Sequence, residues 1–225
     1  MSNSEKIVIP GEIIEKDSKK AGDNTEVTER GVISTRLGVI QRSGSKINII
    51  PYSGPYKPKK GDIVIGIIVG YAPNGWFVDI GSGVKAFLPA TEAMKGKFDP
   101  RIHELRDILK IGDVISAKVL ASERLGAPLL TIKSEKGLGK MTTSWFIKVP
   151  VVKIARIIGK RGSMLKLLEK KTGSKIIVGQ NGVLAIEGSY EAYEKVKKAV
   201  NLITEKTFSK GLTERVSKLL EEEGE

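Results

Sequence analysis

The chain has 225 residues, of which 40% are hydrophobic and 28% charged, so an ordinary globular core is expected. Domains of roughly 100–200 residues are usual, and this length therefore predicts one large domain or two to three small ones. Lys and Arg total 38 against 26 acidic residues, a formal net charge of +12. Such a surface attracts polyanions, which makes nucleic acid the first candidate partner and an anionic membrane the second. The alternatives are a solubilising surface and the lysine-rich surface of a thermophile's protein.

Composition also excludes several kinds of site. The chain contains no cysteine, which excludes disulfides, thiol nucleophiles and cysteine zinc sites. His103 is the only histidine, so metal sites with several histidines are excluded as well. No apolar run approaches the roughly 20 residues that cross a bilayer, and residues 1–20 lack the apolar core of a signal peptide. We expect a cytoplasmic chain with no membrane anchor, no metal and no other cofactor.

Residues 1–55 are predicted to form a small all-β domain. Short β-type runs occur in this segment, separated by the polar stretch DSKKAGDNTE; they read KIVIP, EIIEK, GVISTRLGVI and KINIIP. The Pro- and Gly-rich stretch PYSGPYKPKKGD that follows is typical of a linker.

Residues 61–136 are predicted to form a second domain. Strand-like runs follow one another as DIVIGIIVGYA, GWFVDI, VKAFLP, DVISAKVLAS and PLLTIK. Asn74-Gly75 is expected to take positive φ in a tight turn between the first two. A polar, partly helical connection separates the third run from the fourth. Five strands with a helical insert after the third is the chain order of an OB barrel, and a five-stranded sandwich fragment is the alternative.

Residues 141–206 carry the pattern β-α-α-β-β-α. A strand WFIKVP precedes two helical segments, VVKIARII and SMLKLLEKKTG, and a hairpin follows with its turn at Asn181-Gly182. An amphipathic helix capped by Ser189 completes this domain. Residues 207–225 are expected to be a short helical tail with a frayed, acidic end.

The first two helices of this third domain meet at the bend Gly159-Lys160-Arg161-Gly162. Glycines let a backbone approach a ligand closely and adopt φ values that other residues resist. The next helix starts at Ser163, and its free N–H groups favour an anion. Lys160 and Arg161, held out by the bend, add two charges for phosphates. The alternative is an interhelical turn with solvated cations.

In its bend and in the order of its elements, the segment 145–206 closely resembles the KH domain. The GXXG loop of that family clamps about four nucleotides of single-stranded RNA or DNA. The resemblance implies that the bend and Ser163 contact the RNA backbone. It also implies a groove for bases beside the bend, with an apolar wall made of Ile154, Ile157, Ile158, Ile176 and Val178.

Residues 61–89 and 110–120 resemble the OB-fold RNA-binding module that is repeated in the largest small-subunit ribosomal protein. Where that family usually has an aromatic residue and a histidine, this chain has Asn74 and Pro89, so the resemblance implies weakened base contact. The RNA-binding face that it implies comprises Tyr71, Trp76, Phe77, Lys85, Phe87 and Arg124. For Phe77 and Phe87 a place in the barrel core is the alternative.

The order of the three domains, with IVIPGEII near the start, resembles the KH-containing RNA-binding cap subunit of the archaeal exosome. The resemblance implies that three copies sit on a hexameric ring of phosphorolytic subunits, docked through the N-terminal domain. They would guide the 3′ ends of single-stranded RNA into the central channel. The resemblance also implies that this chain binds RNA and does not cut it.

No residue is predicted to be catalytic. Asp62 and Asp113 each follow a glycine at a strand start, where turn chemistry explains them. The stretch GSGVKA, residues 81–86, looks like a dinucleotide fingerprint, but a strand follows it where such a site requires a helix. Two other function classes stay open: a free RNA-binding transcription or translation factor, and a nuclease.

Overall fold

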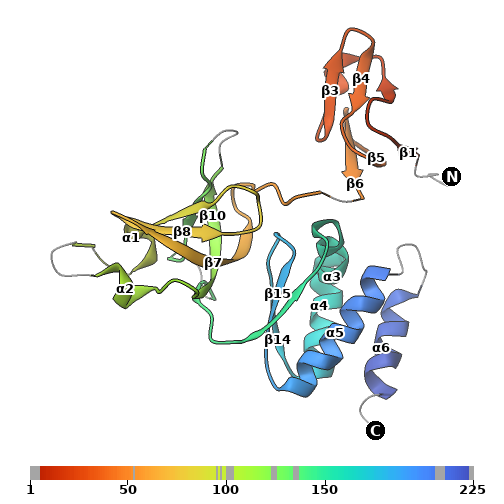
Figure 1. The fold of residues 1–225 in the computed structure, drawn as a ribbon. Helices are drawn as coiled ribbons and strands as arrows, with labels where there is room; N and C mark the ends of the chain where they lie inside the picture. The colour runs from red at the N-terminus through yellow and green to blue at the C-terminus, as the bar shows by residue number, and fades with distance from the viewer. Residues whose placement is uncertain are drawn as a thin grey trace. The chain divides into compact units, whose positions relative to one another are not determined.

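The computed structural model describes residues 6–52, 54–94, 96, 98–99, 104–122, 126–133, 137–205 and 211–222. The chain divides into two compact units, Met1–Gly54 and Pro55–Glu225 (Figure 1). Among the described residues, none of the helices has both the length and the apolar character needed to cross a membrane.

The first unit is all-β, in agreement with the sequence. It contains two three-stranded antiparallel sheets, with strand orders β1-β5-β6 and β2-β4-β3. The strands are β1 (Ile7–Val8), β2 (Ile13–Glu15), β3 (Thr25–Thr28), β4 (Gly31–Ser34), β5 (Gly38–Ser43) and β6 (Lys46–Pro51), with a 3-10 turn η1 (Ser18–Lys20) after β2. Alternation along β6 turns Ile47 and Ile49 inward, and both are almost fully buried.

The second unit begins with a closed five-stranded barrel, so the OB prediction is confirmed and the sandwich alternative is wrong. Its strands are β7 (Ile63–Ala72), β8 (Gly75–Asp79), β9 (Ala86–Pro89), β10 (Val114–Ala121) and β11 (Leu129–Thr131). The barrel closes because β11 pairs with both β9 and β10. The helical insert lies after the third strand as expected, as α1 (Ala90–Ala93) and α2 (Leu105–Ile108), and β12 (Gly139–Lys140) pairs with β10.

Part of the stretch PYSGPYKPKKGD, which was predicted as a linker, packs into the barrel. Tyr56 is 4% exposed and belongs to the barrel core, and its hydroxyl donates a 2.6 Å hydrogen bond to Asp62. Burial and the Asp62 carboxylate raise the pKa of Tyr56 strongly, so the phenol stays protonated.

The predicted β7–β8 turn is wrong in detail. The connecting residues are Pro73 and Asn74, and neither Asn74 nor Gly75 has positive φ. Gly75 is required for a different reason: a Cβ there would collide with the carbonyl oxygen of Leu88 and lie 2.9 Å from the ring of Phe87. The glycine lets β9 approach β8 closely.

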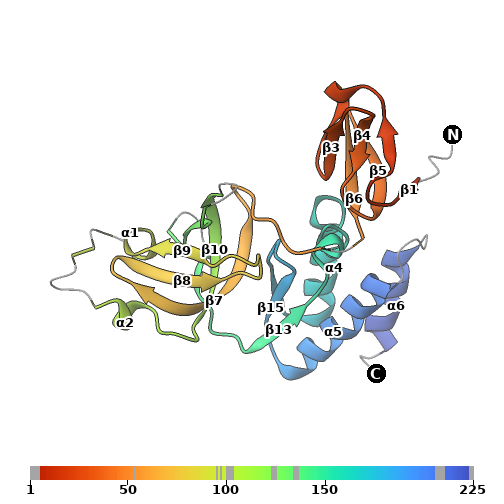
Figure 2. The same cartoon turned by 45° about the horizontal axis from the view of Figure 1, so that its top comes forward.

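The remaining residues confirm the β-α-α-β-β-α order. A sheet of order β13-β15-β14 packs against the helices (Figure 2). The elements are β13 (Trp145–Lys148), η2 (Val151–Lys153), α3 (Ile154–Ile158), η3 (Lys160–Gly162), α4 (Ser163–Thr172), β14 (Lys175–Val178), β15 (Val183–Glu187) and α5 (Tyr190–Glu205). Ser189 caps α5, its hydroxyl accepting a 3.2 Å hydrogen bond from the N–H of Ala192.

The expected tail is part of this domain. Residues of α6 (Leu212–Glu222) pack into the same core, where Val216 and Leu220 are buried. An ion pair of 2.6 Å between Lys171 on α4 and Glu221 holds the two helices together at the surface. The acidic end that was expected to fray lies mostly outside the described residues.

The hairpin turn between β14 and β15 is bonded to the barrel. The side-chain amide of Asn181 donates to the carbonyl oxygens of Ile65 (2.7 Å) and Ile80 (3.0 Å), and its oxygen accepts from the N–H of Ile65 (3.2 Å). Gln180 exchanges two hydrogen bonds with the backbone of Ile63, at 2.8 and 2.9 Å. Because Asn181 is buried, these bonds replace water that the turn would otherwise require.

Candidate nucleic-acid interface

The bend between α3 and α4 adopts a backbone shape that glycine makes accessible. Gly159 (φ 72°, ψ 175°), Arg161 (φ 53°, ψ 30°) and Gly162 (φ 79°, ψ 13°) all have positive φ. A Cβ on Gly159 would lie 2.8 Å from both the backbone nitrogen and the Cβ of Met164. The left-handed conformation of Arg161 is strained for a residue with a side chain, and such strain is often found at binding sites.

The bend presents its charges to solvent, as the sequence predicted. Lys160 and Arg161 are exposed, and Ser163 begins the ten-residue helix α4. In this fully described helix no side chain caps the N-terminus and no acidic residue occupies the first turn. The first-turn N–H groups and the two cations therefore favour an anion such as a phosphate.

Further cations lie on the segments that precede and follow the bend. Lys166 and Lys170 are exposed one turn apart on α4, continuing the positive surface away from Arg161. Burial lowers the pKa of Lys153, and the neighbouring charge of Arg156 adds to the lowering. Lys166 and Lys170 were not among the predicted site residues, although their place on the polar face of an amphipathic helix could have indicated them.

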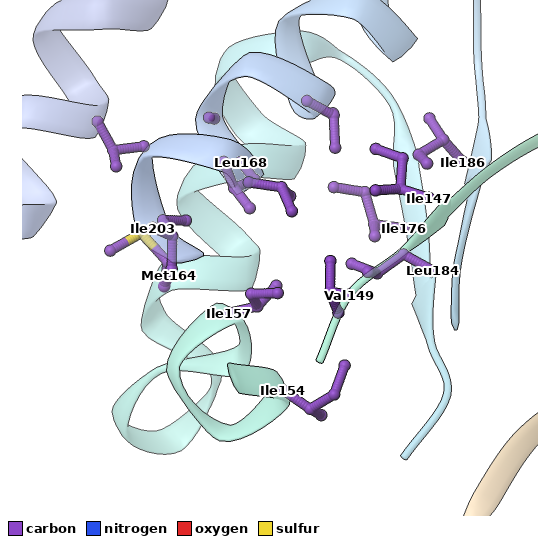
Figure 3. Packing of buried hydrophobic residues seen from close by; sticks show 14 of the residues in the cluster. Ile147, Val149, Ile154, Ile157, Met164, Leu168, Ile176, Leu184, Ile186 and Ile203 are labelled. Carbon is purple, nitrogen blue, oxygen red and sulfur yellow. The ribbon is translucent and has the colours of Figure 1, made fainter. Parts of the chain in front are cut away.

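The predicted groove wall needs a correction. Ile154 and Ile176 are each 4% exposed and Ile157 is fully buried, and all three point into the KH core (Figure 3). The physical reason is that α3 turns its apolar face onto the sheet, and Ile176 on β14 faces the same core from the sheet side. Ile158 and Val178 are only partly buried, so the part of the wall that a base can reach is reduced to these two side chains.

The outer face of the barrel carries an apolar strip that crosses three strands. Phe77 on β8 is 39% exposed, and its ring lies 6.1 Å from that of Phe87 on β9. Phe87 pairs in turn with Leu129 on β11, which is 37% exposed. Gly70 lies opposite Phe77 on β7 and adds no side chain over the ring. The strip therefore consists of Phe77, Phe87 and Leu129, with Lys85 exposed on the loop before β9.

Leu129 was missed in the sequence. The alternation in PLLTIK, where Leu130 is buried and Leu129 is not, is the signal that could have identified it.

Trp76 and Tyr71 do not belong to this strip. Trp76 is fully buried, and its indole N–H donates a 3.0 Å hydrogen bond to the carbonyl oxygen of Leu109. It was predicted to face RNA, which is wrong, because alternation along β8 turns Trp76 inward and Phe77 outward. Tyr71 packs against the barrel core, and the guanidinium of Arg106 lies 5.5 Å from its ring centroid. Arg124 lies outside the described residues.

The acidic residues near the strand starts have structural partners. Asp62 accepts a hydrogen bond from the N–H of Lys59 (3.1 Å), and Asp113 accepts one from the N–H of Lys110 (2.9 Å). The Lys110 N–H and the Lys140 ammonium, 2.8 Å away, hold the pKa of Asp113 below its usual range. The described residues contain no group of three or more His, Asp or Glu that could hold a metal ion, and His103 lies outside them.

Comparisons with known proteins identify the families of the barrel and of the domain that follows it. The S1 RNA binding domain family matches residues 57–133, and the KH domain family matches residues 144–205. A solved structure described as an exosome complex RNA-binding protein is 37% identical, with a TM-score of 0.69; the match covers 76% of this chain and 98% of that one.

Similar curated proteins bear the name exosome complex component Rrp4. The one from Nitrosopumilus maritimus is 32% identical over 100% of both chains. Those from Thermosphaera aggregans and Aeropyrum pernix are 38% and 35% identical, covering 94% and 97% of this chain and 85% and 94% of their own. The chain therefore belongs to the Rrp4 family of exosome complex components.

Proposed function

We propose that this chain is a non-catalytic, RNA-binding subunit of an exosome, which recruits single-stranded RNA and guides its 3′ end to a phosphorolytic exoribonuclease ring. The bend Gly159–Gly162 is the observation that carries this proposal. Two exposed cations directly precede the uncapped start of α4, an arrangement that favours a sugar-phosphate chain without requiring a particular base. The strip Phe77, Phe87 and Leu129 adds apolar surface on which bases can stack.

An apolar face of the N-terminal unit supports docking onto protein subunits. Ile7, Val39 and Ile50 are cross-strand neighbours on the sheet β1-β5-β6, so they share one face. Ile7 is 57% exposed and Ile50 is 44% exposed, whereas Val39 between them is only 9% exposed. Exposed apolar patches of this kind are typical of interaction sites, and we assign this face to the ring. Three copies on a hexameric ring, in the cytoplasm, complete the proposed assembly.

RNA binding through the bend is tested by reversing its charges. Replacing Lys160 and Arg161 together with Asp should weaken binding to single-stranded RNA severely and leave the melting temperature almost unchanged, because both side chains are exposed. A loop that grips about four phosphates contributes a slope of about −3 to log K against log salt, and the variant should lose it. Fluorescence anisotropy with a labelled oligoribonucleotide measures both quantities.

The matched control reverses two other exposed cations, Arg30 and Lys46 on the N-terminal unit, with the same change in net charge. If the control lost as much affinity as the bend variant, binding would follow overall charge and the bend would have no special role.

Docking is tested with Ile7→Asp and Ile50→Asp in the full chain. Both side chains are exposed, so the fold should persist while co-purification with phosphorolytic subunits from native lysate is lost and RNA affinity is kept. Val84→Asp, at a 56% exposed position in the barrel, is the control. A chain that never co-purified with such subunits would be a free RNA-binding factor. Shortening of labelled RNA by the purified chain with magnesium and phosphate would instead identify a nuclease.

A further inference from the structure

A cluster of three aromatic side chains lies on the KH domain, with Trp145 on β13 and Tyr190 and Tyr193 on α5. The ring centroids of Trp145 and Tyr193 are 5.1 Å apart, with 26° between the planes. Tyr190 lies 5.4 Å from Trp145 and 6.2 Å from Tyr193. Trp145 belongs to β13, at the opposite edge of the sheet from β14, which carries Val178. The cluster therefore forms a surface separate from the groove.

The cluster is not simply part of the core. Trp145 and Tyr193 are partly buried against the KH core, but Tyr190 is 58% exposed. A ring that served only to fill the interior would be buried, since an aromatic side chain stabilises a fold through the area that it removes from water. Tyr190 leaves more than half of its surface available to a ligand.

A cavity of about 380 Å³ adjoins Trp145. Hydroxyl groups, a carboxylate and backbone line it; the lining residues are Thr142, Thr143, Ser144, Trp145, Glu187 and Gly188. The hydroxyl of Thr143 accepts a hydrogen bond from the N–H of Trp145 and donates one to the carbonyl oxygen of Ile186, so this segment is fixed on the sheet. An aromatic wall beside hydroxyls and a carboxylate suits a flat ring that carries polar edges.

The charges around the cluster disfavour a cationic guest. Glu187 is already paired with Lys175 at 2.9 Å, and Glu194 with Lys197 at 3.2 Å. Lys197 also lies 5.5 Å from the ring centroid of Tyr193, occupying that cation–π position. Glu191 accepts a hydrogen bond from Ser189. Because two of the three carboxylates are neutralised and the rings contact one another, no cage for an arginine or lysine of a partner is left.

We propose that the cluster Trp145, Tyr190 and Tyr193 is a second contact of the KH domain for single-stranded RNA. A base stacks on the exposed ring of Tyr190, and the polar edges of the nucleotide lie in the cavity lined by Ser144 and Glu187. The inference rests on the proposed RNA-binding function and extends it to a surface distinct from the bend. A polynucleotide held at both surfaces has a longer binding site than the bend alone provides.

The experiment uses the full chain with Tyr190→Ala, and with Tyr190→Phe, which keeps the ring, as the matched control. Stacking of one base contributes about 1–3 kcal/mol, so Tyr190→Ala should bind a single-stranded 15-mer of mixed sequence about fivefold or more weakly. The Tyr190→Phe variant should bind like the original chain. The slope of log K against log salt should stay the same in both, because stacking releases no phosphate counterions.

A direct readout is available because the chain contains two tryptophans, and the other, Trp76, is fully buried in the barrel. RNA should therefore change the emission of Trp145, and this change should shrink in Tyr190→Ala. If Tyr190→Ala bound RNA with unaltered affinity and RNA did not change the tryptophan emission of the original chain, the inference would be overturned. The proposed function would still be tested separately by the bend variants. Loss of ring association in Tyr190→Ala with full RNA affinity would make the cluster a protein contact, which also overturns it.

Discussion

Asn181 on the KH hairpin bonds both backbone groups of Ile65 on the barrel, although 116 residues separate the two in the sequence. A third bond, to the carbonyl oxygen of Ile80, uses the remaining amide hydrogen. One buried side chain therefore satisfies three backbone groups of another domain. Such a junction restrains the position of the KH domain on the barrel. Separating the two would leave buried polar groups without hydrogen bonds, which is destabilising.

Asn181→Ala should loosen this junction. The change leaves the three backbone groups without their partner, at about 1–3 kcal/mol for each buried group that stays unsatisfied, so we expect a loss of about 3 kcal/mol once water enters. Hydrogen exchange of the Ile65 amide should become faster, while amides in the middle of α5 stay protected. Asn201→Ala, at an exposed position on α5, is the control and should change neither the stability nor the exchange rate of the Ile65 amide. An unchanged Ile65 exchange rate would show that Gln180 and packing hold the domains without Asn181.

The sequence predicted Asn181 only as a turn residue, because local patterns do not predict contacts between domains. A hairpin turn is read from neighbouring residues, and here Gly182, with φ of 86°, supplies the unusual conformation. The partner of the Asn181 side chain depends on how two domains meet, and no local period encodes that. The elements themselves were predictable, because the periods of two and 3.6 residues distinguish strands from helices in this chain.

The exposure of the candidate site residues was predictable where it follows from charge and was not predictable where it follows from packing. Lys160 and Arg161 are exposed because removing two adjacent cations from water costs free energy, and the glycines beside them offer no group that offsets it. Ile154 on α3 and Ile176 on β14 were assigned to a groove and lie in the core, since the local pattern of apolar residues does not distinguish a core position from a groove wall. The burial of Trp76 could have been predicted from the sequence around it. Asp79 must face solvent, and alternation then places Phe77 outward and Trp76 inward.

Gly159 and Gly162 should respond differently to alanine. Gly159→Ala places a Cβ 2.8 Å from the backbone of Met164 at a φ and ψ that only glycine adopts freely, so we expect a loss of about 3 kcal/mol or more. Gly162 also has positive φ, but nothing lies within 4 Å of its Cβ position. Gly162→Ala should therefore lose only about 1 kcal/mol, from its left-handed backbone. Urea unfolding of the two variants measures the difference, and equal losses would mean that the contact with Met164 relaxes freely.

Phe77→Ala should weaken RNA binding more than it weakens the fold. Its ring is 39% exposed on the outer face of the barrel, where a stacked base contributes about 1–3 kcal/mol. We expect a corresponding loss of affinity with a small change in melting temperature. Ile111→Ala, at a 57% exposed apolar position in the turn before β10, is the control and should leave affinity unchanged. A large fall in melting temperature with intact affinity would assign Phe77 to the barrel core, the alternative that its sequence position left open.

Asp113→Asn should change the pH dependence of stability. The pKa of Asp113 is lowered in the folded chain from its ordinary value of 3.8, because the Lys110 N–H and the Lys140 ammonium favour the carboxylate. A lowered folded pKa means that the stabilisation is complete above the unfolded pKa and is lost as the pH falls through the folded one. The difference in melting temperature between the original chain and the variant should therefore be constant well above pH 3.8 and shrink as the pH falls through the lowered pKa of the folded chain. Other groups titrate equally in both chains and cancel in this difference. Glu26→Gln, at an exposed position on β3, is the control, and a difference for Asp113→Asn that persists unchanged at pH 2 would attribute its effect to packing of the turn and not to charge.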